Sequence, residues 1–209
     1  MGCNNEQCSD TSNVVTICYS NIHCDYDYGD LPDFNLPGTY PTDITDGGEG
    51  AGAAHVILPD FFIGAVVDEE TDGQPSTDAL DDGADEDGVT LPTALFTGQT
   101  GVEVPITIQV PTGTEGQVVG WIDWNADGIL SPGEAATSSI ISGTTATTQQ
   151  VTLSFDVPAD ANTTQPLGAR FRLFDVNETN MSSIGVSLLG GEVEDYLVGV
   201  RPCPTQNCR

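Results

Sequence analysis

The sequence contains no lysine, and its only strongly basic side chains are Arg170, Arg172, Arg201 and Arg209. Without lysine, the chain cannot form a Schiff base, a lysine-dependent isopeptide crosslink or the lysine contact of a P-loop. Against these four arginines stand 32 acidic residues, which give a formal net charge of -28 at pH 7. Such a charge repels nucleic acids and anionic membrane surfaces, so we expect neither as a partner. It also opposes compaction of the chain, an effect that bound cations would relieve.

Cysteine and long apolar runs are also missing from most of the chain. No cysteine occurs in residues 25–202, and no apolar segment is long enough to span a membrane, so we expect no direct membrane insertion. The six cysteines are confined to the two ends, at Cys3, Cys8, Cys18, Cys24, Cys203 and Cys208. Their even number, without a Cys-x-x-Cys pair or a histidine cluster, favours disulfides over the alternative of a zinc site. Disulfides imply an oxidising compartment, so we predict a secreted, extracellular protein of the cell surface.

Histidine is scarce, since His23 and His55 are the only two. Neither lies in a Gly-x-Ser-x-Gly or His-Glu-x-x-His motif. His55 stands at the head of an apolar run and is expected to be a hydrogen-bonded structural residue. Paired carboxylates could hydrolyse glycosides, but here most acidic clusters have the spacing of metal loops, and a coordinated carboxylate transfers protons poorly. We therefore predict that the chain is not an enzyme, with a glycoside hydrolase as the least favoured reading.

Residues 123–134 have the spacing of a calcium-binding loop. The predicted ligands of one Ca²⁺ are the side chains of Asp123, Asn125, Asp127 and Glu134 and the backbone carbonyl of Ile129. Gly128 permits the sharp turn that such a loop needs at its sixth position. A strand-like run precedes the loop and Pro132 disfavours a helix at its end, so it resembles an EF-hand loop without the helices. The alternative is an Asx-rich turn that binds no metal.

More than half of the acidic residues lie in residues 25–87, in local clusters. Two of these clusters repeat the pattern of acids followed by glycine, at residues 68–73 and 81–88. We predict that they hold at least one further Ca²⁺, with ligands from Asp68, Glu70, Asp72, Asp81, Asp82, Asp85 and Asp87. The alternative is a solvated acidic segment. Unneutralised, however, so many carboxylates within a Debye length of roughly 8 Å would repel one another strongly.

Short runs of β-branched and aromatic residues predict strands at residues 55–58, 61–67, 102–110, 117–124, 150–157, 169–174 and 192–200. No amphipathic helix separates them. This pattern predicts an all-β protein, an antiparallel β-sandwich of Ig-like or jelly-roll type with long acidic calcium-binding loops. Only loops are expected in the Gly- and Pro-rich residues 34–52, which follow the acidic segment 25–33. We divide the chain into a cysteine-rich arm at 1–24, the sandwich at 25–200 and a cysteine-containing tail at 201–209.

Strand alternation makes two predictions about buried side chains. Arg170 and Arg172 fall on one face of their strand, where charge alone suggests Glu192 and Glu194 as partners; these two lie on one later strand. Trp121 and Trp124 fall on opposite faces of theirs, so at least one of them belongs to the core.

Residues 191–196 read Gly-Glu-Val-Glu-Asp-Tyr. Further motifs are Asp-Tyr-Gly-Asp-Leu-Pro-Asp at 27–33, Gly-Ala-Ala-His at 52–55, Asp-Gly-Gln-Pro-Ser at 72–76, Asp-Glu-Asp-Gly-Val at 85–89, Gly-Trp-Ile-Asp-Trp-Asn at 120–125 and Arg-Phe-Arg at 170–172. Together these motifs resemble the GEVED-domain modules of bacterial secreted and cell-surface proteins, in order from about residue 25 to 200. The resemblance implies a calcium-loaded β-sandwich without catalytic activity. The cysteine-bearing ends are not part of the family pattern.

We therefore predict a secreted structural module that is rigidified by calcium and disulfides. It is expected to form a homo-polymer, with a strand at residues 14–17 of the N-terminal arm adding to a sheet edge of a neighbouring copy. A contact of this kind propagates as a filament when its rotation does not close. The alternative is an adhesin or carbohydrate-binding module that stacks a glycan on tryptophan or tyrosine side chains.

Overall fold

A five-stranded antiparallel sheet lies at the centre of the molecule. The computed structural model describes residues 25–33, 39–43, 52–79, 86–145 and 148–204, together with the backbone of 6–9 and 17–20. In the central sheet, β10 (Ile141–Ser142), β8 (Glu115–Ile122), β12 (Leu167–Asp175) and β14 (Gly191–Val198) are neighbours in that order, and β9 (Ala135–Thr137) also pairs with β8. All residues of β12 except the last are buried, so both faces of this sheet are covered.

A second antiparallel sheet covers one face of the central sheet. It contains β11 (Gln149–Phe155), β7 (Val102–Gln109) and β5 (Phe62–Ile63), with β7 in the middle. In β7 buried and exposed residues alternate, as expected for a strand with one face on the core and one in water. The main hydrophobic core lies between the two sheets, and its aromatic members include Phe155, Phe171 and Trp124. The chain is therefore nearly all β, with antiparallel sheets enclosing its core, as the sequence predicted.

The opposite face of the central sheet is covered by a third layer, here called the N-terminal layer because most of it comes from the N-terminal half of the chain. This layer contains β13 (Gly185–Ser187), β4 (Ala53–Val56) and β3 (Tyr26–Tyr28); β13 pairs with β4 in parallel, and β4 pairs with β3 antiparallel. A second hydrophobic cluster, which includes Leu31, Tyr40, Trp121 and Phe174, fills the space beneath it. The central sheet is thus enclosed on both sides.

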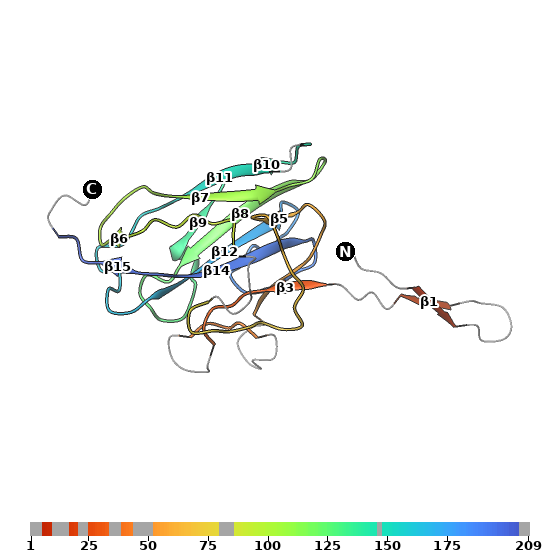
Figure 1. The fold of residues 1–209 in the computed structure, drawn as a ribbon, viewed down its shortest axis with the longest axis horizontal. Coiled ribbons are helices and arrows are strands. Elements are labelled where there is room, and N and C mark those ends of the chain that lie inside the picture. The colour runs from red at the N-terminus through yellow and green to blue at the C-terminus, as the bar shows by residue number, and fades with distance from the viewer. Residues whose placement is uncertain are drawn as a thin grey trace.

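Two small sheets lie at opposite ends of the longest axis of the molecule (Figure 1). At one end β15 (Val200–Arg201) pairs in parallel with β6 (Leu95–Phe96). At the other end the hairpin of β1 (Glu6–Ser9) and β2 (Ile17–Ser20) projects away from the other sheets. Between β8 and β9 the short 3-10 helix η1 (Pro132–Glu134) completes the regular elements.

Each strand predicted within residues 53–200 overlaps an observed strand, whereas β3 lies in residues 25–33, for which no strand was predicted. The strand predicted at residues 14–17 falls mostly outside the described residues. Trp121 and Trp124 are both buried, one in each hydrophobic cluster, which confirms that at least one belongs to the core. Neither tryptophan is therefore exposed for glycan stacking, which leaves tyrosine side chains for the carbohydrate-binding alternative. No helix in the described part of the chain is long and apolar enough to cross a membrane.

Candidate functional site

The predicted calcium loop begins where β8 ends and is turned by two residues in the left-handed region. Ala126 has a φ of 61° and Gly128 a φ of 81°. Gly128 meets the expectation for the sixth loop position, because glycine adopts this conformation without steric cost. Ala126 adopts it as a non-glycine residue, which is uncommon. These two turns bring the later part of the loop back over the side chain of Asp123.

Asp123 lies at the centre of the loop and is completely buried. Its Oδ2 accepts hydrogen bonds from the N–H of Gly128 at 2.9 Å and from the hydroxyl of Tyr40 at 2.8 Å, while its Oδ1 accepts from the N–H of Asp127 at 3.2 Å. The Tyr40 hydroxyl in turn accepts from the N–H of Gly168 at 2.9 Å. Burial, followed by the charge of Asp123, raises the pKa of Tyr40, so this hydroxyl stays protonated and donates. Asp123 therefore connects the loop to the N-terminal layer.

Asn125 and Asp127 lie on the exposed side of the same loop. Asn125 Oδ1 accepts from the N–H of Asp127 at 2.9 Å, and Asn125 Nδ2 donates to Asp127 Oδ2 at 2.9 Å. Asp127 Oδ1 accepts from the N–H of Ile129 at 2.9 Å, and the Ile129 side chain is 63% exposed. Oxygens of alternate residues are thus directed into the turn by local hydrogen bonds.

Glu134 closes the loop by hydrogen bonding. Its Oε1 accepts from the N–H of Trp124 at 2.9 Å, and its Oε2 accepts from the N–H and hydroxyl of Ser131 at 3.0 and 2.8 Å. The carboxylate is 8% exposed and forms the capping box of η1. The Ser-x-x-Glu spacing of residues 131–134 is the sequence signature of this capping box, which the calcium-loop prediction did not use.

The loop satisfies part of what a calcium site requires. Its candidate ligand atoms are oxygens, without sulfur or imidazole, as a hard cation prefers. The turn at Gly128 is already formed. In the described residues no three His, Cys, Asp or Glu side chains are grouped so that they could hold a metal ion. Glu134 is directed to Trp124 and Ser131, so it would have to turn to become a ligand. Calcium binding by this loop stays a prediction.

The acidic residues of the first half have separate surroundings. Glu70 is buried and its Oε2 accepts from the N–H of Tyr28 at 2.7 Å, whereas Asp68 is exposed. Asp72 accepts from the N–H of Gly73 at 3.0 Å. Burial raises the pKa of Tyr28, and the charges of Asp72 and Glu70 add to the increase, which places both carboxylates near this ring.

Asp87 contacts a different part of the chain. Its Oδ1 accepts from the N–H of Ala65 at 2.7 Å, and its own N–H donates to Glu194 Oε1 at 3.1 Å. Asp81, Asp82 and Asp85, which were also predicted as ligands, lie outside the described residues. Asp43, which was not among the predicted ligands, is a further carboxylate near Asp72. The pKa of Asp43 is raised by burial, by Asp72 and by a third neighbouring acid, Asp33.

The strand that carries the Gly-Glu-Val-Glu-Asp-Tyr motif, β14, directs its acidic side chains to opposite faces. Glu192 and Glu194 lie opposite Leu173 and Phe171 of β12, which belong to the main core, whereas Asp195 lies opposite Arg170 on the other face. Glu192 accepts a short hydrogen bond from the N–H of Ile63.

Glu194 is held inside the protein by hydrogen bonds from a facing loop and from its own strand. Its Oε1 accepts from the N–H groups of Asp87 and Gly88 at 3.1 and 2.8 Å, and its Oε2 accepts from the hydroxyl of Tyr196 at 3.0 Å. Burial raises the pKa of Glu194 to about 8, although these hydrogen bonds oppose the increase. Glu192 and Glu194 thus act as acceptors for backbone N–H groups that face the core.

The predicted pairing of the arginines with Glu192 and Glu194 is wrong. Arg170 donates through Nε and Nη2 to the two oxygens of Asp195, at 2.8 and 2.7 Å, and both residues are completely buried. Arg172 donates through Nε to His55 Nε2 at 2.9 Å. The reason is the alternation of β14, which places Asp195 on the arginine face and the two glutamates on the other.

Arg172 and His55 join the central sheet to the third layer. The remaining guanidinium N–H groups of Arg172 donate to backbone carbonyls, including those of Ala54 and Gly185 at 3.0 and 2.9 Å. His55 Nδ1 lies 3.0 Å from the carbonyl oxygen of Gly190. Because His55 Nε2 accepts, Nδ1 carries the proton and the ring is neutral. Burial and the charge of Arg172 hold the pKa of His55 well below its usual value. His55 is therefore a hydrogen-bonded structural residue, as predicted.

The cysteines are described only in part. Cys203 is disulfide-bonded, and its N–H donates to the hydroxyl of Thr97 at 3.1 Å. The side chains of Cys3, Cys8, Cys18, Cys24 and Cys208 lie outside the described part of the chain. In the β1–β2 backbone register, Cys8 is opposite Cys18. The disulfide connectivity stays open.

Comparison with known proteins supports one of the sequence-based conclusions. No curated protein matches the chain. A family model does match, over residues 117–199. The matched segment contains the loop after Trp121, the Arg-Phe-Arg motif and the hexapeptide at 191–196, while the motifs of the first half lie before it. The model is that of the GEVED domain, so the resemblance found in the sequence is confirmed for residues 117–199.

Proposed function

We propose that this chain is a secreted, calcium-binding structural module that is stabilised by disulfides and self-associates in an extracellular or cell-surface assembly. The loop at residues 123–134 carries the proposal. Three carboxylates and one amide oxygen fall within twelve residues, and Asp123 is buried beneath a turn of the kind that calcium loops use. In this proposal the sandwich is of the Ig-like or jelly-roll type with calcium-binding acidic loops.

Charge supplies the second argument. A chain with a net charge of -28 repels copies of itself, and each bound divalent cation removes two negative charges. A site that is saturated a hundredfold above its dissociation constant adds about 2.7 kcal/mol of stability. That is a large part of the roughly 5–15 kcal/mol by which a domain is stable. Calcium is therefore expected both to stabilise the module and to permit its assembly.

The experiment measures melting temperature and calcium binding together. The wild-type chain is stripped with a chelator and titrated with Ca²⁺ in a calorimeter, and its melting temperature is recorded with and without the ion. Asp127→Asn removes one carboxylate from the exposed side of the loop, and Asp160→Asn removes one from an exposed turn elsewhere. We expect weaker binding and a smaller temperature rise for Asp127→Asn alone. Equal behaviour of both variants, or no response of the wild type to calcium, would refute the assignment of the loop.

A second measurement concerns the acidic first half. If residues 68–87 also hold calcium, chelation should speed hydrogen exchange around Glu70 and Asp87, far in sequence from the first loop. Exchange that is unchanged between residues 52 and 90 would contradict the second site and leave the first intact.

A further inference from the structure

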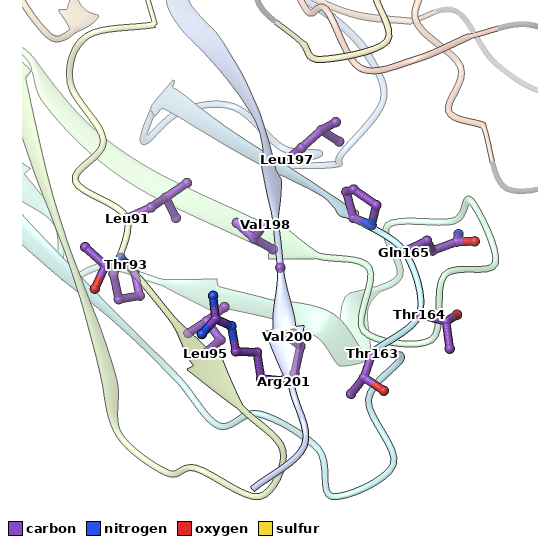
Figure 2. A pocket seen from close by; sticks show the side chains of 13 residues that line it. Leu91, Thr93, Leu95, Thr163, Thr164, Gln165, Leu197, Val198, Val200 and Arg201 are labelled. Atoms are coloured by element: carbon purple, nitrogen blue, oxygen red, sulfur yellow. The ribbon is translucent and has the colours of Figure 1, made fainter. Parts of the chain in front are cut away.

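A cleft of about 450 Å³ opens at the end of the molecule where β12 and β14 part. The ladder between these strands stops at Leu167, opposite Val198, because Pro166 has no N–H to donate. Beyond this point the chain segments diverge. In Figure 2 the segment from Val198 to Arg201 runs between residues 163–166 on one side and residues 91–95 on the other.

The floor of the cleft presents a strand edge. In the parallel pair of β15 and β6, the N–H of Thr97 donates to the carbonyl oxygen of Arg201 at 3.0 Å. Backbone polar groups of successive strand residues point to opposite sides, so those of Val200, which lines the cleft, are directed away from β6. A strand edge of this kind can pair with an added strand.

The cleft also carries an exposed positive charge. Arg170 and Arg172 are buried, and Arg201 is the one arginine with an exposed side chain among the residues that the structure describes. In a chain with a net charge of -28, this end of the molecule is therefore the place where an acidic segment of another copy is repelled least.

The β1–β2 hairpin has the complementary features. It pairs with no other strand of the described chain, and an isolated two-stranded hairpin is marginally stable in water. Its first residue, Glu6, is acidic. It projects from the end of the molecule opposite to β6 and β15, away from the cleft of its own copy (Figure 1).

We propose that this cleft receives the β1–β2 hairpin of a second copy, which extends the β15 edge at Val200. This inference rests on the proposed self-association and names its acceptor site. Because donor and acceptor are different surfaces at opposite ends, the contact is heterologous and builds an open filament. Arg201 lies beside the entering strand and attracts its acidic residue.

Gly199 offers a way to close the cleft without disturbing the fold. No atom lies within 4 Å of the position that a Cβ at Gly199 would occupy. Gly199 lines the cleft, so Gly199→Leu adds a side chain at its wall without a clash, and Ser154→Leu, on the exposed face of β11, is the matched control. Sedimentation and electron microscopy of the oxidised full chain in calcium should show filaments for the wild type and the control and monomers for Gly199→Leu. The calcium-dependent melting temperature of Gly199→Leu should be unchanged.

A crosslinking measurement identifies the occupant directly. Because the chain has no lysine, Gln165→Lys introduces a single side-chain amine at the rim of the cleft. An amine-to-amine reagent can then join this lysine only to an N-terminal amine or to another copy of itself. We expect a ladder of oligomers in which peptide mapping joins Lys at position 165 to the N-terminus of the next copy. Ser154→Lys should give no such ladder.

The outcomes separate the two proposals. Filaments of Gly199→Leu, with no crosslink between the cleft and the N-terminus, would overturn the acceptor site and leave the calcium-binding assembly standing. A wild-type chain that stays monomeric at high concentration in calcium would overturn both self-association and the acceptor site. Filaments and crosslinks that form equally after chelation would support the cleft and refute the role of calcium.

Discussion

Asp195 should be the most sensitive acidic side chain of the fold. It is completely buried and accepts two hydrogen bonds from Arg170. Its Oδ2 also accepts from the N–H groups of Asp30 and Leu31, at 2.8 and 3.0 Å. One carboxylate thus connects β14, β12 and the N-terminal layer. The change Asp195→Asn keeps the size of the side chain, removes its charge and replaces one acceptor oxygen with a donor.

The size of the expected loss of stability depends on Arg170, the partner that remains when Asp195 is replaced. Asp195→Asn leaves the buried guanidinium of Arg170 without its counter-charge. Removing one partner of a buried ion pair costs about 3–5 kcal/mol. For a domain of this size, each kcal/mol corresponds to about 2–4 °C of melting temperature. We therefore expect a decrease of roughly 6–20 °C.

Trp121 and Trp124 provide the assay, because both are buried and their fluorescence will report unfolding in urea. Asp160→Asn, an exposed change of the same chemical kind, is the control and should alter stability by no more than about 0.5 kcal/mol. A loss below about 1 kcal/mol for Asp195→Asn, with an unchanged slope against urea, would refute the role assigned to this ion pair.

Three further predictions concern contacts between layers. His55 is neutral when folded and its pKa is lowered, so its contribution to stability falls as the pH drops below about 6.5; the free energy of unfolding of the wild type, measured relative to His55→Gln so that the opposite contribution of Glu194 cancels, should fall by about 2 kcal/mol between pH 7 and pH 5. Tyr40→Phe removes the hydroxyl that joins Asp123 to the N–H of Gly168 and should cost about 1–3 kcal/mol in urea unfolding. Gly168→Ala would place a Cβ 2.4 Å from the Tyr40 ring, so we expect overpacking to lower stability by about 1–3 kcal/mol, and a melting temperature equal to wild type would contradict this.

Local patterns predicted the strands and the loop because their causes are local. The spacing of residues 123–134 fixes which oxygens face the turn, and Asp123 and Gly128 have the positions in the loop that this spacing predicts. Alternation likewise placed Arg170 and Arg172 on one face of β12. It could not name their partners, because register decides which face of β14 meets the arginines, and a slip of one residue would exchange Asp195 for its glutamate neighbours.

The N-terminal layer was missed for a different reason. Residues 25–43 have no hydrophobic periodicity, and their positions are fixed by hydrogen bonds to distant residues. The N–H of Asp30 donates to Asp195, and the N–H of Val193 donates to Asp27 at 2.7 Å. Contacts between residues more than 160 positions apart leave no signal in a local window of sequence.

The burial of the arginines determines where two copies of this chain can meet. Arg170 and Arg172 neutralise charge inside the fold, so the described exterior keeps Arg201 as its one exposed arginine against many carboxylates. Copies that approach through surfaces with exposed carboxylates bring like charges within a Debye length of roughly 8 Å at physiological salt. Added salt shortens that length, and bound calcium lowers the charge itself. Added salt and bound calcium should therefore both favour the proposed head-to-tail contact. Calcium should act at concentrations too low to change the Debye length, and this difference distinguishes specific binding from general screening.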